Sequence, residues 1–147
     1  MKTTFSFKSA LLAGIIATAV MTLFTYMSPL MGFDMNIPEM LANTMGTPVI
    51  IGWLAHFMIG IILTLSYAIL FLSLIKSDAS IKTGTIFGFF PWLLAQIIVM
   101  PLVNVMAGGS FSSGLFSGSF IIAMASLVGH LIYGAVLGFL YKSISQK

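Results

Sequence analysis

The chain's two histidines are the residues whose type and spacing point most clearly to chemistry. They occupy matching positions in two similar stretches, GWLAHFMIGIILTLSY at residues 52–67 and SLVGHLIYGAVLGFLY at residues 126–141, so His56 and His130 are 74 positions apart. Both stretches lie within long apolar runs. An unpaired histidine in a bilayer costs free energy, so we expect each of the two to have a bonding partner and a function.

The sharpest hypothesis is a bis-histidine b-type haem site. Two neutral imidazoles on facing helices would ligate the iron, and Gly60 and Gly134 would make room for the flat macrocycle. Depth argues against this, because His56 is expected about six residues, or roughly 9 Å, nearer the outside than His130. The offset shrinks if the helix over residues 49–75 extends beyond the membrane. The alternative is structural histidines, hydrogen-bonded to threonine, Gln96 or a carbonyl.

Each histidine also belongs to a stripe of small residues that recur at every fourth position. Residues at this spacing lie on one helix face, where small side chains let transmembrane backbones approach closely. We therefore expect the stripes to form a helix-packing seam whichever ligand the histidines bind. The first stripe contains Gly52, His56, Gly60 and Thr64, and the second contains Ser126, His130, Gly134 and Gly138.

Methionines suggest a third kind of site, because thioethers are soft ligands for Cu(I). Seven of the eleven methionines lie at or near the predicted outward face, although methionine is also ordinary packing material in membranes. The identity of any metal stays open. These seven are Met27, Met31, Met35, Met40, Met45, Met100 and Met106.

Other chemistry finds little support. The chain has no cysteine, which excludes disulfides, thiolate nucleophiles and iron–sulfur clusters. No predicted membrane helix carries Asp or Glu, so neither a carboxylate proton relay nor a Ser-His-Asp triad can form within the bilayer. The six lysines are dispersed and there is no arginine, which argues against a nucleic-acid groove. We therefore expect a protein that is not an enzyme.

Composition places these side chains in a membrane protein. The chain has 147 residues, of which 59% are hydrophobic and 6% charged. A crossing needs roughly 20 apolar residues, so four helices with short loops occupy nearly the whole chain as a single transmembrane domain, residues 1–147. The predicted helices cover residues 9–31, 49–75, 83–106 and 119–141. The loop at residues 32–48 contains NIPEMLANTMG, which predicts a short interfacial helix capped by Asn36.

The lysines predict the orientation. They fall only on the N-terminus, the loop between the second and third helices, and the C-terminus, at Lys2, Lys8, Lys76, Lys82, Lys142 and Lys147. By the positive-inside rule these parts are cytoplasmic, which suits a bacterial inner membrane. An N-terminal signal peptide is the alternative reading of the first apolar run; its cleavage would leave three helices.

The two similar stretches also predict an internal repeat. Two consecutive helical hairpins would be related by an axis along the membrane normal, with the second and fourth helices facing each other. The predicted fold is thus an all-α membrane protein, a bundle of four transmembrane helices in two pseudo-repeated helical hairpins, with the N- and C-termini cytoplasmic.

The runs AGIIATAVMT, NIPEMLANTMG and GWLAHFMIG resemble a family of small four-helix bacterial inner-membrane proteins of unknown function. The resemblance covers most of the chain. It implies the four-helix fold and carries no activity.

Three functional hypotheses follow. The first is a non-enzymatic accessory or interaction subunit, in contact with the lipid bilayer and with a larger membrane complex or further copies of itself, because the chain has almost no polar surface and short loops. The second is a haem b electron carrier with His56 and His130 as ligands. The third is a permease for a small solute or for a metal such as copper, with a polar path along Thr18, Thr22, Gln96 and Asn104.

Overall fold

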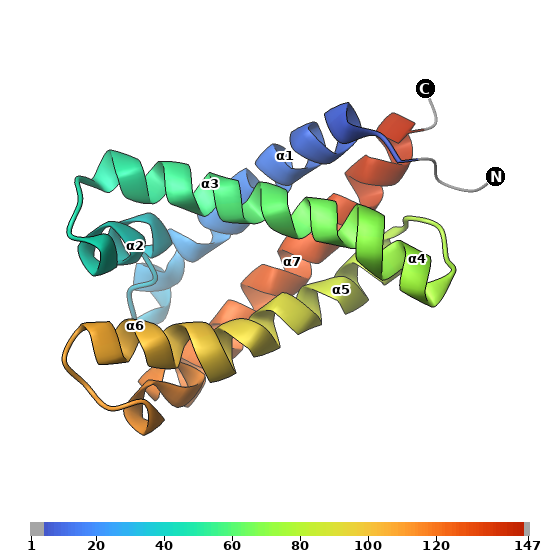
Figure 1. Cartoon of the computed structure of the whole chain (residues 1–147). Coiled ribbons are helices and arrows are strands. Elements are labelled where there is room, and N and C mark those ends of the chain that lie inside the picture. The colour runs from blue at the N-terminus through green and yellow to red at the C-terminus, as the bar shows by residue number, and fades with distance from the viewer. Residues whose placement is uncertain (1–4, 146–147) are drawn as a thin grey trace.

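The computed structural model describes the backbone of residues 5–145 and the side chains as far as Tyr141. Lys2 and Lys147, and the side chain of Lys142, lie outside the described residues. The described part contains helices and no strands, and both chain ends lie at the same end of the molecule (Figure 1). The α-helices are α1 (Phe7–Thr25), α2 (Ile37–Met45), α3 (Val49–Ser66), α4 (Leu72–Ile75), α5 (Ile81–Leu94), α6 (Met100–Met106) and α7 (Phe120–Ser145).

Several of these helices join into continuous spans. A π-helical segment, Tyr67–Phe71, links α3 to α4, and a second one, Ala95–Val99, links α5 to α6. Four segments are then long and apolar enough to cross a membrane: Phe7–Met31, Val49–Ile75, Ile81–Met106 and Phe120–Tyr141. The expectation of an all-helical protein with four membrane-spanning helices is confirmed.

The helix ends follow local sequence rules. Ser6 caps α1 by accepting a hydrogen bond from the Ser9 amide, and Ser80 caps α5 in a reciprocal pair with Thr83. Asn36 caps α2 in the same way, and Gly46 ends that helix at a φ of 62°, a left-handed conformation that favours glycine. The α2 region is therefore a true helix of nine residues that connects two spans.

The third span widens into a π-helical turn just before Pro101, whereas Pro91 lies inside the regular helix α5. Pro101 has no amide hydrogen to donate, and the turn before it widens so that the Met100 amide bonds the Ala95 carbonyl five residues back. Beyond α6, the segment that leads to α7 contains a short 3₁₀ turn, Ser112–Gly118. Asn104 holds this segment by donating to the carbonyl of Ser110 at 2.7 Å and to the hydroxyl of Ser113 at 2.8 Å.

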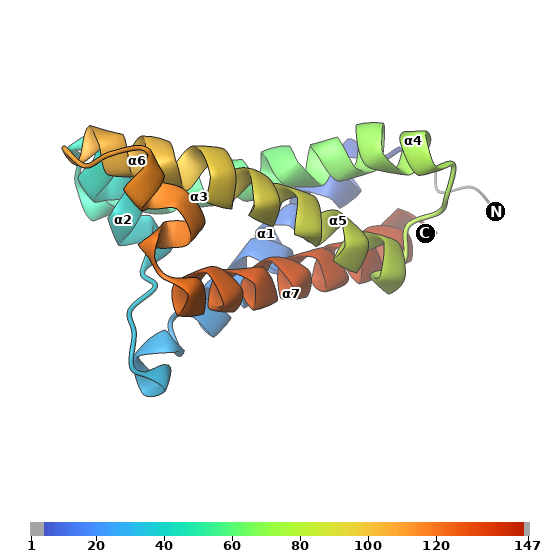
Figure 2. The same cartoon turned by 90° about the horizontal axis from the view of Figure 1, so that it is seen from below.

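Packing occurs both within the two hairpins and between them. Helix α1 packs against α3 and also against α7, α5 packs against α7, and α2 covers the beginning of α3 (Figure 2). Among the described residues α3 and α7 share little backbone contact, so the second and fourth spans do not face each other along their lengths as the repeat predicted. Both small-residue stripes are instead used inside their own hairpins.

Aromatic side chains close the end of the bundle that contains both chain termini, which we call the tyrosine end. The rings of Tyr67 and Tyr141 meet edge to face at 6.3 Å, and Phe87 lies 5.2 Å from Tyr67. The Tyr67 hydroxyl is 2.8 Å from the hydroxyl of Thr83, and the Tyr141 hydroxyl accepts from the Ser6 amide at 3.2 Å. The opposite end, which we call the α2 end, is far more open.

Candidate functional site: a histidine-lined cavity

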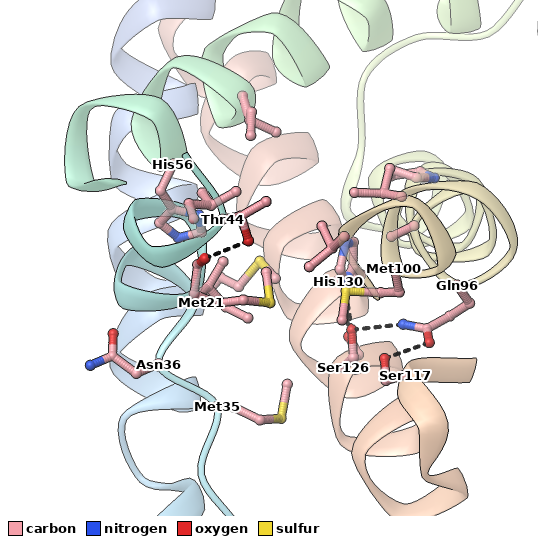
Figure 3. A pocket seen from close by; sticks show the side chains of 18 of the residues that line it. Met21, Met35, Asn36, Thr44, His56, Gln96, Met100, Ser117, Ser126 and His130 are labelled. Carbon is pink, nitrogen blue, oxygen red and sulfur yellow. Dashed lines mark hydrogen bonds between the residues drawn. The ribbon is translucent and has the colours of Figure 1, made fainter. Parts of the chain in front are cut away.

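A cavity of about 930 Å³ opens toward the α2 end of the bundle. All four spans contribute to its wall, together with α2 and the 3₁₀ turn that precedes α7. His56 on α3 and His130 on α7 lie on opposite sides of it (Figure 3). Its volume is near the upper limit of ordinary small-molecule sites, which is large for a chain of this size.

The contacts of His56 lead to a tautomer assignment. Its Nε2 lies 2.9 Å from the hydroxyl oxygen of Thr22, which lies 2.7 Å from the Thr18 carbonyl oxygen. We assign the Thr22 proton to that carbonyl, so that Nε2 of His56 carries the ring proton and Nδ1 keeps a lone pair. The side chain is 6% exposed.

His130 adopts the opposite tautomer. Its Nδ1 lies 2.8 Å from the Ser126 carbonyl oxygen, which can only accept. The proton is therefore on Nδ1, and Nε2 has the lone pair. No buried side-chain nitrogen or oxygen of the described residues lacks a partner, so the second ring nitrogens of both histidines must reach open space. Two neutral imidazoles thus present one acceptor nitrogen each at the wall of a shared cavity.

Gln96 belongs to a separate polar cluster on the wall formed by the third span. The Ser117 hydroxyl donates to its Oε1 at 2.8 Å, and its Nε2 donates to the Ser126 hydroxyl at 3.4 Å. Gln96 lies in the π-helical segment Ala95–Val99, where the widened turn directs it inward. Of the histidine partners that the sequence suggested, a threonine and a carbonyl are used, and Gln96 is not.

Tyr133 forms the floor of the cavity, and the sequence analysis did not single it out. Its hydroxyl donates to the Gly60 carbonyl and lies 2.8 Å from the hydroxyl of Thr64, which ties α7 to α3. Tyr133 occurs one helical turn after His130, and its counterpart in the first stretch is Ile59. This difference between the two similar stretches, tyrosine in one and isoleucine in the other, is the sequence feature that could have drawn attention to Tyr133.

The glycines beside the histidines fill a different role from the one that haem requires. A Cβ on Gly60 would collide with Thr18 of α1, and one on Gly134 would collide with the Gly84 backbone of α5. Both therefore make room for a neighbouring helix. The remaining members of the predicted seam behave alike, because Gly52 touches the α2 backbone, Gly138 touches Ser80 and Gly84, and Thr64 approaches Gly14.

The histidine nitrogens also fit a bis-histidine haem poorly as they stand. His56 offers Nδ1, the ring nitrogen next to Cβ, where a macrocycle would meet the side chain's own stem and the helix. His130 offers the less hindered Nε2. The two residues share a cavity, but they are not an equivalent pair of axial ligands.

Methionines line much of the cavity. Those that contribute are Met21, Met35, Met40, Met100 and Met106, and of the seven predicted at the outward face Met27, Met31 and Met45 are exposed and do not line it. Among the described residues no cluster of three or more His, Cys, Asp or Glu side chains could hold a metal ion. The thioethers supply polarizable apolar surface around two imidazoles, and because thioethers are not among those four ligand types, the copper hypothesis stays a prediction.

Carboxylates approach the cavity only at its rim. Asp34 and Glu39 are exposed at the α2 end, where Glu39 accepts a hydrogen bond from the Asn36 amide group at 2.8 Å. The wall at the level of the histidines has no carboxylate.

Three apolar side chains that line the cavity are also exposed on the protein. Ile59, Leu94 and Val99 are 41%, 51% and 42% exposed. Ile59 and Leu94 lie near the middle of their spans.

Comparison with known proteins agrees with this picture of a small membrane protein. No curated protein and no solved structure matches the chain. A family model matches residues 6–147, nearly the whole chain. The chain belongs to the Family of unknown function (DUF6789).

Proposed function

We propose that this protein is a non-enzymatic accessory subunit of a membrane system that holds a small, lipid-soluble ligand in the cavity between its spans. The observation that carries the proposal is the cavity of about 930 Å³, whose wall combines apolar side chains with two acceptor nitrogens. Mostly apolar concave sites with a few convergent polar groups are typical of ligand binding.

Two features support a binding role over catalysis. The membrane-spanning segments contain no Asp or Glu, and the carboxylates near the cavity lie at its exposed rim. A general acid–base pair needs titratable groups within hydrogen-bond reach of a substrate. The two histidines instead lie on opposite sides of the cavity, each anchored by a protein partner (Figure 3).

We further infer a multi-pass topology in a bacterial inner membrane with the tyrosine end in the cytoplasm. The lysines support this, because Lys8, Lys76 and Lys82 all belong to segments at the tyrosine end. The positive-inside rule then places the mouth of the cavity at the α2 end on the external side. The ligand would enter from the outer leaflet or the external solution.

The internal repeat is part of the same proposal. Gly14 approaches Thr64 in the first hairpin, and Gly84 approaches Gly138 in the second. The helix-capping residues Ser6 and Ser80 are 74 positions apart, like the two histidines. The hairpins differ mainly at the α2 end, where α2 has no counterpart in the second hairpin. We infer that this asymmetry creates the cavity.

Ligand retention tests the proposal. The protein would be purified in mild detergent and analysed by native mass spectrometry, with Ala95→Trp designed to fill the cavity and Ile98→Trp as the matched control. Ala95 lines the cavity, whereas Ile98 is 43% exposed outside it. We expect a bound small molecule in the wild type and in the Ile98 variant, and its loss in the Ala95 variant.

The same preparation distinguishes the other functions. A reduced b-type haem spectrum lost in both His56→Ala and His130→Ala would replace the proposal with electron transfer. Uptake of a small solute or Cu(I) into sealed vesicles, abolished by Ala95→Trp, would replace it with transport. A protein that migrates only as a free monomer on a native gel of gently solubilised membranes would argue against a partner complex or homo-oligomer.

A further inference from the structure

We propose that the ligand is a hydrogen-bond donor of the hydroquinone type, a flat ring with two hydroxyl groups and an apolar tail. This inference rests on the proposed binding function and specifies the chemistry of that site. The assignment depends on which hydrogen-bonding capacity the cavity wall leaves unused.

The Ser126 hydroxyl, which accepts from Gln96, keeps its own proton, but five other hydroxyl protons around the cavity are committed to protein acceptors. Each is donated to a backbone carbonyl or an amide oxygen, and the donors are Thr18 to Gly14, Thr22 to Thr18, Thr44 to Met40, Ser117 to Gln96 and Tyr133 to Gly60. Two acceptor nitrogens also remain at the wall, Nδ1 of His56 and Nε2 of His130. A ligand complementary to these two nitrogens must donate.

The placement of the two acceptors calls for two donors. They belong to α3 and α7 and approach the cavity from opposite sides (Figure 3). A single hydroxyl group would satisfy one imidazole and leave the other unpaired against an apolar ligand, which costs free energy. A ring with hydroxyl groups at opposite edges offers one donor to each imidazole.

Size, shape and charge agree with this ligand. The cavity is large enough for a substituted ring, and methionine thioethers make favourable contacts with ring edges. The exposed apolar side chains of Ile59, Leu94 and Val99 at the wall suit an apolar tail. Since no charged side chain lies at the level of the histidines and the carboxylates at the rim repel anions, a neutral ligand is favoured over an anionic one.

Binding of three probes tests the inference. A benzohydroquinone with a decyl tail, its dimethyl ether and its monomethyl ether would be titrated into the full-length protein in lipid nanodiscs and followed by calorimetry. One net hydrogen bond is worth about 1 kcal/mol, or about fivefold in affinity. We expect the monomethyl ether to bind about fivefold more weakly than the hydroquinone, and the dimethyl ether about 25-fold more weakly.

Variants identify the acceptors. His56→Ala and His130→Ala should each reduce hydroquinone affinity about fivefold while leaving dimethyl ether affinity nearly unchanged. The control is Ser66→Ala, an exposed hydroxyl that bonds the Ile62 carbonyl away from the cavity, and it should change neither affinity. Because the probe comparison is made on the wild type, it stays decisive even if a histidine variant fails to fold.

Equal affinity for hydroquinone and dimethyl ether would overturn the inference but leave ligand binding in the cavity intact. Failure of all three probes, with a co-purified molecule still lost in Ala95→Trp, would also overturn the hydroquinone assignment alone. Failure of all three probes together with no co-purified molecule would overturn both proposals.

Discussion

The contact between α5 and α7 should be among the least tolerant sites in the bundle. Gly84 lies where a Cβ would come within 2.8 Å of the Gly138 Cα and amide nitrogen, and closer still to the Gly134 carbonyl. All three are backbone atoms. No side-chain rotation can relieve the overlap, so Gly84→Ala would force the two helices apart along the contact.

The loss of unfolding free energy in Gly84→Ala can be estimated by comparison with a matched control variant. Overpacking typically costs about 1–3 kcal/mol, and because this overlap is with rigid backbone we take the upper part of that range. Gly129→Ala introduces the same methyl group where its nearest neighbours are Met21 and Phe24, at 3.6 Å or more, which is ordinary contact. Replacing glycine in a helix gains up to about 1 kcal/mol. Both variants share this gain, so it cancels in the comparison, and we expect the two to differ by about 2–3 kcal/mol, the overpacking cost alone.

The measurement is reversible unfolding in mixed micelles, with the fraction of denaturing detergent as the variable and near-ultraviolet circular dichroism as the signal. Trp92 is a suitable reporter, because its indole donates to the Ala123 carbonyl across the same helix pair at 2.9 Å. Equal unfolding free energies for Gly84→Ala and Gly129→Ala would refute the close α5–α7 contact, and with it the arrangement of the cavity wall.

Three further outcomes follow from the same contacts. Tyr133→Phe removes the hydroxyl that donates to the Gly60 carbonyl and should lower the unfolding free energy by about 1 kcal/mol, measured in the same micelles; no change would mean that this bond is absent. Thr22→Val removes the acceptor of the His56 Nε2 proton, so nitrogen-15 spectra of the imidazole should show a mixture of tautomers instead of one; an unchanged spectrum would contradict the assigned tautomer. Asn36→Ala removes the cap of α2 and should speed amide exchange in that helix by about fivefold, from a loss of about 1 kcal/mol, while exchange in the spans stays unchanged; equal acceleration throughout would contradict a local cap.

The positions of the spans could be read from the sequence because the bilayer imposes them. A crossing needs a long apolar run, and polar or lysine-containing segments end each one, so the expected helices at residues 49–75 and 119–141 differ little from the observed spans Val49–Ile75 and Phe120–Tyr141. The α2 helix was equally readable, since Asn36 and Gly46 are local capping residues that act without tertiary contacts. The widened turn before Pro101 accompanies that residue's missing amide hydrogen, but Tyr67–Phe71 widens in the same way with no proline.

Tertiary structure decided which helices pack together and which side chains bond to each other. In a soluble protein the apolar face of a helix marks the buried side, but in lipid every face is apolar, and the small-residue stripes show that a helix packs closely without showing against which helix. The stripes of α3 and α7 accordingly pack against α1 and α5 rather than against each other. The partners of His56 and His130, the role of Tyr133 and the cavity all depend on that choice, because they arise where side chains from different spans meet.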